Sequence, residues 1–194
     1  MSTELMQTTL QRLPTWGDFI TICSPANLCR QYSKVTRIYH SIERSRISLK
    51  EISEAYPQTD GVPAGMLYVK TWIEYFNEFS NINKPLPHTQ INNVSVMLYT
   101  KYLHFYLSDL KLILEWILEG RYGKFYGSVD SQLILSAFYE YNNELEKILY
   151  ESNSKKEVNV ESKDILKLSL LSTEEIDNLL PTFTAWKKNK NIDI

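Results

Sequence analysis

Apolar residues recur at steps of three and four along most of this chain, and such spacing indicates amphipathic helices. Turn-forming and helix-capping residues divide the pattern into six main segments. These segments cover approximately residues 24–45, 48–56, 63–79, 89–105, 108–120 and 130–150. No segment shows a strict alternation of apolar and polar positions that would require a β-strand. We therefore predict an all-α fold, a bundle of about six helices.

Local signals predict where several of these helices begin. Ser24 can cap free backbone amides, and Pro25 fits the first helical turn because its missing N–H costs nothing there. Ser48 and Glu51 have the spacing of a capping box, which predicts a short second helix. We expect Ser108 to cap the fifth helix in the same way.

The first long helix, from residue 24 to about residue 45, has two distinct faces. Its apolar face contains Leu28, Tyr32, Val35, Tyr39 and Ile42. Its basic face contains Arg30, Lys34, Arg37 and Arg44. A cationic helix face can contact nucleic acid or an acidic partner. The simpler alternative is that these cations only face solvent, where single charges contribute little.

The composition changes after residue 150. Residues 151–163 are rich in serine, lysine, glutamate and asparagine and have few large apolar side chains, which favours a linker. We predict a helical body over residues 1–152. Residues 153–194 are expected to form a polar linker, one or two short helices and a loose tail.

Residues 120–130 read Gly-Arg-Tyr-Gly-Lys-Phe-Tyr-Gly-Ser-Val-Asp and stand between two apolar helical segments. The stretch lacks the spacing of a phosphate-binding loop. One interpretation is a structural joint, because glycine permits left-handed backbone angles and aspartate caps a following helix. The joint residues are Gly120, Gly123, Gly127 and Asp130. The other interpretation is a corner near a helix start that binds an anion or a peptide. The corner residues are Arg121, Lys124 and Tyr126.

Composition narrows the classes of function. The chain has 194 residues and a formal net charge of -2, so it fits a single domain and has no overall attraction for polyanions. Cys23 and Cys29 are too few to staple a fold of this size, and we expect a cytoplasmic protein. The richest apolar segment, residues 103–118, is too interrupted to span a membrane. The interrupting residues are His104, Ser108, Asp109, Lys111 and Glu115.

Residues for metal or covalent chemistry do not cluster in the sequence. His40, His88 and His104 lie far apart, and no cysteine or histidine stands at a zinc-ligand spacing. We therefore predict no metal site, no cofactor and no catalytic residues.

One part of the sequence resembles a known family. The residues that carry the resemblance are Ser108-Asp109-Leu110, the run from Gly120 to Gly127, Asp130, and Glu140-Tyr141. They resemble an uncharacterised family of small proteins from phages and mobile elements of Bacteroides-type bacteria. The resemblance extends over residues 98–145, and its most specific part is Tyr-Gly-x-Phe-Tyr-Gly. It implies a setting in a mobile element and supplies no catalytic residues.

These observations lead to a functional prediction. We predict a non-enzymatic accessory or adaptor protein of a phage or mobile element that acts through protein–protein contacts. Nucleic acid is the second class of partner, at the basic helix, and DNA replication or its control is the expected process. The alternatives are a small ligand-binding module or enzyme with a site at residues 120–130, and a counter-defence protein.

Overall fold

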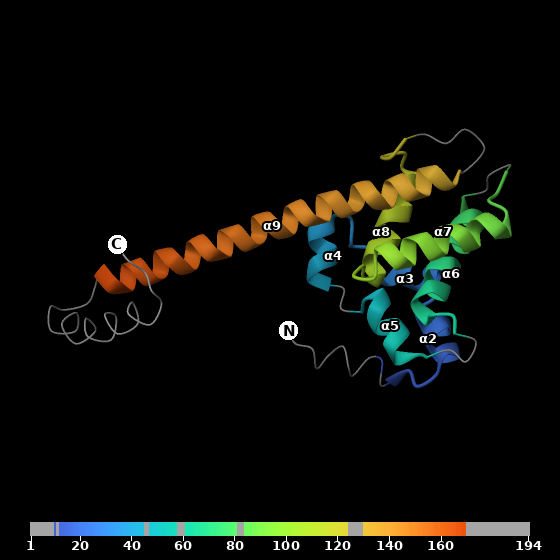
Figure 1. Ribbon diagram of the computed structural model, residues 1–194, viewed down its shortest axis with the longest axis horizontal. Coiled ribbons are helices and arrows are strands. Elements are labelled where there is room, and N and C mark those ends of the chain that lie inside the picture. The colour runs from blue at the N-terminus through green and yellow to red at the C-terminus, as the bar shows by residue number, and fades with distance from the viewer. Residues whose placement is uncertain are drawn as a thin grey trace. The chain divides into compact units, whose positions relative to one another are not determined.

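The computed structural model describes residues 10, 12–44, 47–57, 61–80, 84–123 and 130–169. Within these ranges the chain forms α-helices and no strand, apart from an isolated bridge between Ser48 and Tyr106. The helices (Figure 1) are α2 (Trp16–Ile22), α3 (Pro25–Gln31), α4 (Ile38–Arg44), α5 (Leu49–Ala55), α6 (Ala64–Phe79), α7 (His88–Lys101), α8 (Leu107–Leu118) and α9 (Ser131–Ser169). The predicted all-α fold is therefore confirmed.

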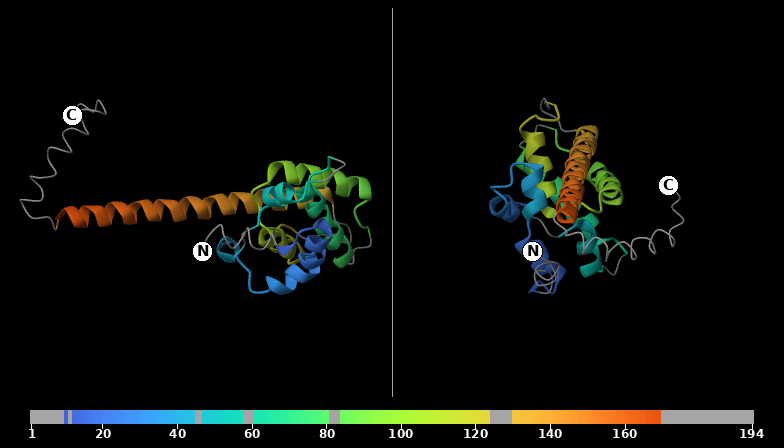
Figure 2. Two further views of the ribbon diagram at one scale, coloured as in Figure 1. Left: turned by 90° about the horizontal axis from the view of Figure 1, so that it is seen from below. Right: turned by 90° about the vertical axis from the view of Figure 1, so that its left-hand side faces the viewer.

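Helix α6 is central to the packing of the first part of the chain. It packs against α5 and α7, and it also contacts α3 and α8 (Figure 2). The reason is its sequence, because Tyr68, Trp72 and Phe76 recur at helical spacing and are each at least 98% buried. The start of α9 packs through aromatic side chains. Phe138 contacts Tyr102 with ring centroids 5.9 Å apart.

The chain divides into two compact units, residues 1–146 and residues 147–194. Residues 131–146 of α9 belong to the first unit, and α9 continues as helix to Ser169. The polar stretch over residues 151–163, which is expected to be a linker, has a helical backbone. Glutamate and lysine are good helix formers even where they are poor core residues. The division of domains at residue 152 stays a prediction.

The long basic helix expected over residues 24–45 is wrong, because residues 25–44 form α3 and α4 with a connection over residues 32–37. In this connection the Val35 N–H donates to the Tyr32 carbonyl at 2.8 Å. The Val35 carbonyl, which a continuous helix would use internally, accepts from the Lys111 ammonium at 2.9 Å. The break also changes which residues are buried. Val35 and Ile38 enter the core, whereas Tyr39 is 58% exposed.

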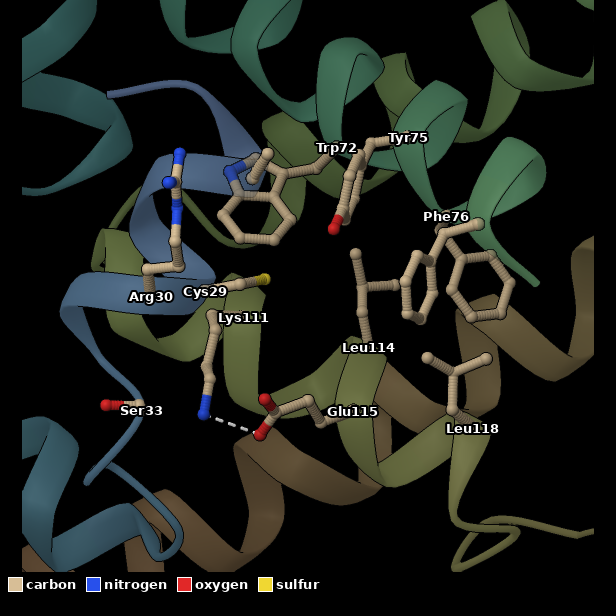
Figure 3. A pocket seen from close by; sticks show the side chains of 12 residues that line it. Cys29, Arg30, Ser33, Trp72, Tyr75, Phe76, Lys111, Leu114, Glu115 and Leu118 are labelled. Carbon is tan, nitrogen blue, oxygen red and sulfur yellow. Dashed lines mark ion pairs between the residues drawn. The ribbon is translucent and has the colours of Figure 1, made fainter. Parts of the chain in front are cut away.

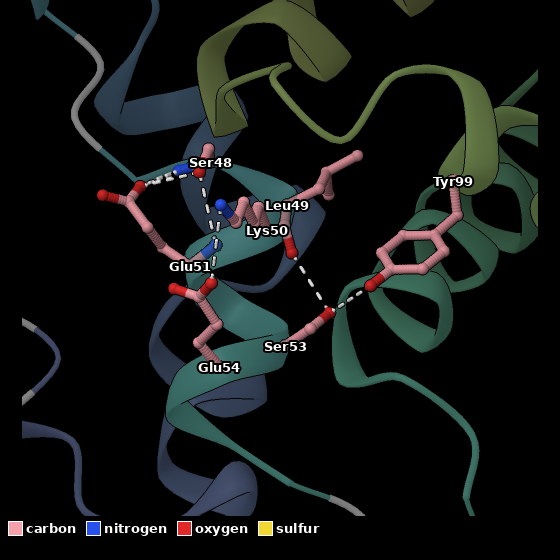
Figure 4. Close-up of polar contacts among 7 residues, drawn as sticks. All are labelled: Ser48, Leu49, Lys50, Glu51, Ser53, Glu54 and Tyr99. Atoms are coloured by element: carbon pink, nitrogen blue, oxygen red, sulfur yellow. Dashed lines mark hydrogen bonds and ion pairs between the residues drawn. The ribbon is translucent and has the colours of Figure 1, made fainter.

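Helix α5 begins as predicted. The Ser48 hydroxyl accepts from the Glu51 N–H, and the Glu51 carboxylate accepts from the Ser48 N–H at 2.7 Å (Figure 4), so the capping box is confirmed. The next two free amides of α5 also have partners. Leu49 N–H donates to the Phe105 carbonyl and Lys50 N–H to the Leu103 carbonyl, each at 3.0 Å.

Helix α7 ends at Lys101 rather than near the predicted residue 105. Beyond its end, the Phe105 N–H donates to the Tyr102 carbonyl, and the Leu103 and Phe105 carbonyls accept from α5. The chain then turns into α8, which begins at Leu107. The predicted Ser108 cap is wrong, because Ser108 lies inside the first turn of α8 and is fully buried. Instead of a Ser108 cap, the start of α8 has a hydrogen bond from the Tyr106 N–H to the Asp109 carboxylate at 2.8 Å.

Helices α5, α6 and α7 approach most closely at Gly65. The Gly65 N–H donates to the Ser53 hydroxyl at 2.9 Å. The same hydroxyl lies 2.8 Å from the Tyr99 hydroxyl and 3.2 Å from the Leu49 carbonyl (Figure 4). A single serine therefore ties three helices together where a glycine allows their backbones to meet.

Candidate functional site

A cavity of about 450 Å³ opens between α3, α6 and α8 (Figure 3), and we call it the α3–α6–α8 groove. Its volume lies within the range of ligand-binding pockets in proteins. The α6 wall consists of Trp72, Tyr75, Phe76 and Phe79. They share one face of the helix because each stands three or four residues from another member of the set. Trp72 and Phe76 are buried, whereas Phe79 is 63% exposed. The wall thus extends from the core to the surface.

The exposed part of this wall is a stacked aromatic pair. The Tyr75 and Phe79 rings lie 5.7 Å apart with an interplanar angle of 18°. Trp72 meets Tyr75 edge to face at 6.2 Å. Aromatic side chains held by such contacts lose little conformational freedom when a further group packs on them.

The α8 wall has an apolar part and a charged part. Leu114 and Leu118 are one turn apart and continue the apolar surface opposite α6. Lys111 and Glu115 are also one turn apart and form an ion pair with 2.5 Å between the ammonium nitrogen and a carboxylate oxygen. The Lys111 side chain is only 1% exposed, so its charge is balanced inside the protein by Glu115 and by the Val35 carbonyl.

The α3 side of the groove contains Ala26, Cys29, Arg30 and Ser33. The Cys29 thiol lies near the Tyr75 hydroxyl, Lys111 and Glu115, at the polar end of the groove (Figure 3). Burial is the main cause that raises the pKa of Cys29, and the Glu115 charge adds to it. A thiol with a raised pKa stays protonated at neutral pH and is a poor nucleophile.

Cys29 is expected to react with iodoacetamide more slowly in the folded chain than in urea, because the thiolate is the reactive form. Cys23 is expected to react more slowly still, since it is buried and its pKa is raised to about 11. Mass spectrometry of the two alkylated peptides over time measures both rates. Equal rates for Cys29 in the folded and unfolded chain would contradict the burial of its thiol.

A second polar cluster joins α4, α8 and α9 in the core. The Asp109 carboxylate accepts hydrogen bonds from the Ser41 hydroxyl and the Tyr141 hydroxyl, each at 2.5 Å. The Ser41 and Ser108 hydroxyls lie 2.5 Å apart. All four residues are at least 99% buried, so a substrate cannot reach them. The cluster holds helices together, and residues 108, 109 and 141 of the family resemblance have this structural role.

The four cations of the predicted basic face do not form one stripe. Arg30 lies in α3, at the rim of the groove, and donates to the Asn27 side chain at 2.6 Å. Lys34 and Arg37 are exposed in the α3–α4 connection. Arg44 is the last residue of α4, and its side chain lies outside the described residues. The structure thus brings Arg30 to the groove and sets Lys34 and Arg37 in the segment that follows.

The predicted corner at residues 120–130 is described only in part. The Arg121 guanidinium lies 3.5 Å from the Trp116 ring centroid and forms an ion pair with Glu144 at 2.7 Å, so its charge is used within the chain. Lys124 and Tyr126 lie outside the described residues. Their role at an anion or peptide site stays a prediction.

The described joint residues end one helix and begin another. Gly120 has a φ of 78°, and the Arg121 N–H donates to the Trp116 carbonyl at 2.9 Å, the pattern of a left-handed helix end. Gly123 also has a positive φ, of 112°. The Asp130 carboxylate accepts from the Gln132 N–H at the start of α9. Gly127 lies outside the described residues.

Residues 85–166 match the model of a family of unknown function, DUF6633. The matched part includes α7, α8 and most of α9, and hence the α8 wall of the groove. The α3 and α6 walls lie outside it. No curated protein and no solved structure matches the chain. The setting in a phage or mobile element stays a prediction.

Within the described ranges, histidine, cysteine, aspartate and glutamate nowhere gather in a group of three or more that could bind a metal ion. None of the helices described has the length and apolar character needed to cross a membrane.

The pattern of the sequence indicated the α6 wall but not the groove. Trp72 and Phe76 stand on the apolar stripe that predicts the helix. Lys111 and Glu115 look in the sequence like polar interruptions of an apolar segment. Their spacing of four residues was the available signal, because oppositely charged residues at that spacing lie together on a helix.

Proposed function

We propose that this chain is a non-enzymatic adaptor that binds a partner protein through the α3–α6–α8 groove. The observation that supports this most directly is the α6 aromatic wall, which begins in the core at Trp72 and ends at Phe79, 63% exposed. A large apolar side chain at the mouth of a cavity is typical of a surface that another protein covers.

The polar groups of the groove favour binding over catalysis. Lys111 and Glu115 neutralise each other, and Lys111 also donates to a backbone carbonyl. The Cys29 thiol has a raised pKa, which opposes nucleophilic attack at neutral pH. General acid–base or nucleophilic catalysis needs a group that is free to gain or lose a proton near the substrate. The groups described here are engaged with one another instead.

The expected contribution of the aromatic wall is large enough to anchor a partner. Fully burying an exposed phenylalanine side chain contributes about 1.5–3 kcal/mol, so burying the remaining 63% of Phe79 contributes about 1–2 kcal/mol. A difference of about 1.4 kcal/mol changes a dissociation constant tenfold. Phe79 alone can therefore change the affinity of a partner by about tenfold. The roles in DNA replication and in a mobile element, and the counter-defence alternative, stay predictions from the sequence.

A phage-displayed library of random peptides tests the proposal on the full chain. Peptides about four helical turns long are long enough to fill such a groove. We expect the recovered peptides to bind at least about tenfold more weakly to Phe79→Ser, as measured by fluorescence anisotropy. The matched control is Met97→Ser on α7, which removes another exposed apolar side chain that does not line the groove.

Urea unfolding of both variants shows whether each keeps the native fold. Equal affinity of the peptides for the native chain and for folded Phe79→Ser would refute the proposal. Failure to recover any peptide whose binding depends on Phe79 would also refute the proposal.

A further inference from the structure

The α3–α6–α8 groove is bordered by cations on its α3 side. Arg30 and Ser33 line the groove there (Figure 3), and Lys34 and Arg37 follow in the chain. The side chains of all three cations are exposed. The sequence has no acidic residue from position 19 to position 42, so nothing in this segment neutralises them locally. This side of the groove is therefore electropositive.

The opposite end of the groove is apolar. Figure 3 shows Phe76 and Leu118 across the cavity from Arg30, and Phe79 and Leu114 also line the groove. Glu115 is the acidic residue of the lining, and it is paired with Lys111, so the pair adds no net charge. The groove thus combines an apolar end with a basic side.

We infer that the partner segment is acidic on one side of an apolar anchor, and this inference rests on the proposed function. The anchor, one or two large apolar side chains, packs between the α6 aromatic wall and the α8 leucines. Aspartate or glutamate residues beside the anchor face Arg30, Lys34 and Arg37. The part of the segment that faces the apolar end carries no charge, because a charged group would lose its hydration there without gaining a partner.

The same charges favour a protein segment over nucleic acid. A nucleic-acid strand has a negative charge at every phosphate, so it would meet Glu115 and the apolar end of the groove as well as the cations. Nucleic-acid binding draws on many phosphate contacts, about six to ten in a protein whose affinity depends strongly on salt. Of the described cations at the groove, Lys111 is paired with Glu115, which leaves Arg30, Lys34 and Arg37. An acidic peptide can match this divided pattern, whereas a uniform polyanion cannot.

A charge-reversal experiment tests the inference with the same displayed peptides and the full chain. The double variant Lys34→Glu, Arg37→Glu reverses two exposed cations without changing the cavity wall. The control is Lys84→Glu, Lys147→Glu, which changes the net charge equally at exposed positions outside the groove. We expect the first variant to weaken the peptides at least about tenfold and the control to leave their affinity within about twofold.

Two more readouts belong to the experiment. Enriched peptides should contain a large apolar residue with aspartate or glutamate on one side of it. Their affinity should fall as the salt concentration rises from about 0.05 M to about 0.5 M, because the attraction is screened. Fluorescein-labelled oligo-dT, added in parallel, tests the nucleic-acid alternative.

The outcomes separate this inference from the proposed function. If the peptides depend on Phe79 but not on Lys34 and Arg37, the groove binds protein and the acidic chemistry is wrong. If they do not depend on Phe79, the proposed function itself fails. If oligo-dT binds, loses affinity with the Lys34 and Arg37 reversals and competes with the peptides, nucleic acid is the ligand and the inference is overturned.

Discussion

Replacing Asp109 with alanine is expected to lower the free energy of unfolding by about 3 kcal/mol. The carboxylate accepts from the Ser41 hydroxyl, the Tyr141 hydroxyl and the Tyr106 N–H, and it is 1% exposed. Alanine leaves these donors without their acceptor in a place that water does not reach. Urea denaturation followed by circular dichroism measures the change.

Two matched variants show whether the loss comes from these bonds. Asp109→Asn keeps the size and one carbonyl acceptor for the Tyr106 N–H, so it should cost only about 1 kcal/mol. Glu119→Ala removes an exposed acid just after α8 and should change stability by less than about 0.5 kcal/mol. A cost for Asp109→Ala no larger than that of Glu119→Ala would show that the buried cluster does not stabilise the fold.

The stability conferred by Asp109 should depend on pH in a defined direction. Burial raises the pKa of the Asp109 carboxyl, although hydrogen bonds from Ser41, Tyr141 and Tyr106 lower it in part. Between the ordinary aspartate pKa and this raised value, the folded chain holds a proton that the unfolded chain has released. The stability that this proton confers is therefore complete below the ordinary aspartate pKa. It is lost as pH rises through the raised pKa that Asp109 has in the folded chain. Asp109→Asn should lack this dependence, so unfolding free energies of the two chains from about pH 3 to pH 7 provide the test.

Gly65→Ala is expected to destabilise the fold by about 3 kcal/mol. A methyl group at residue 65 would lie 2.3 Å from the Leu49 carbonyl oxygen and 2.8 Å from a Tyr99 ring carbon. The first neighbour is backbone and cannot rotate away. Helices α5 and α6 would have to separate, which would also break the bond from the Gly65 N–H to Ser53. The midpoint of urea unfolding measures the loss.

Gly17→Ala in α2 is the matched control. A methyl group there meets only the Thr15 side-chain oxygen, at 3.7 Å, and alanine is the better helix former. We expect this variant to be unchanged or more stable by up to about 1 kcal/mol. Equal changes in stability for Gly65→Ala and Gly17→Ala would show that α5 and α6 do not approach each other so closely at residue 65.

Features set by neighbouring residues could be predicted from the sequence. The capping box of Ser48 and Glu51 and the left-handed end at Gly120 depend on interactions within a few residues, and both are present. The apolar stripe of α6 also predicts its buried face, because Trp72 and Phe76 recur at helical spacing. The exposure of Phe79 did not follow from the stripe, since the same spacing places a residue in a core or at the mouth of a groove.

Features set by distant residues could not be predicted. At the break between α3 and α4 the Val35 carbonyl accepts from Lys111, and no local pattern near Val35 indicates this partner. Asp109 and Lys111 resemble surface residues by type, yet both are buried and bonded to residues far away in the sequence. The helical backbone beyond residue 150 has a different origin. Few apolar residues there indicate a linker, yet lysine and glutamate also favour helix.

The bond between Lys111 and Val35 has a consequence for the order in which the chain folds. These residues are 76 positions apart, and Ser41 and Asp109 are 68 positions apart. Contacts across such long sequence separations form slowly, because a long loop must close first. During synthesis, the α3–α4 connection therefore acquires its final partners only after α8 has been made. The groove is complete only when α8 packs against α3.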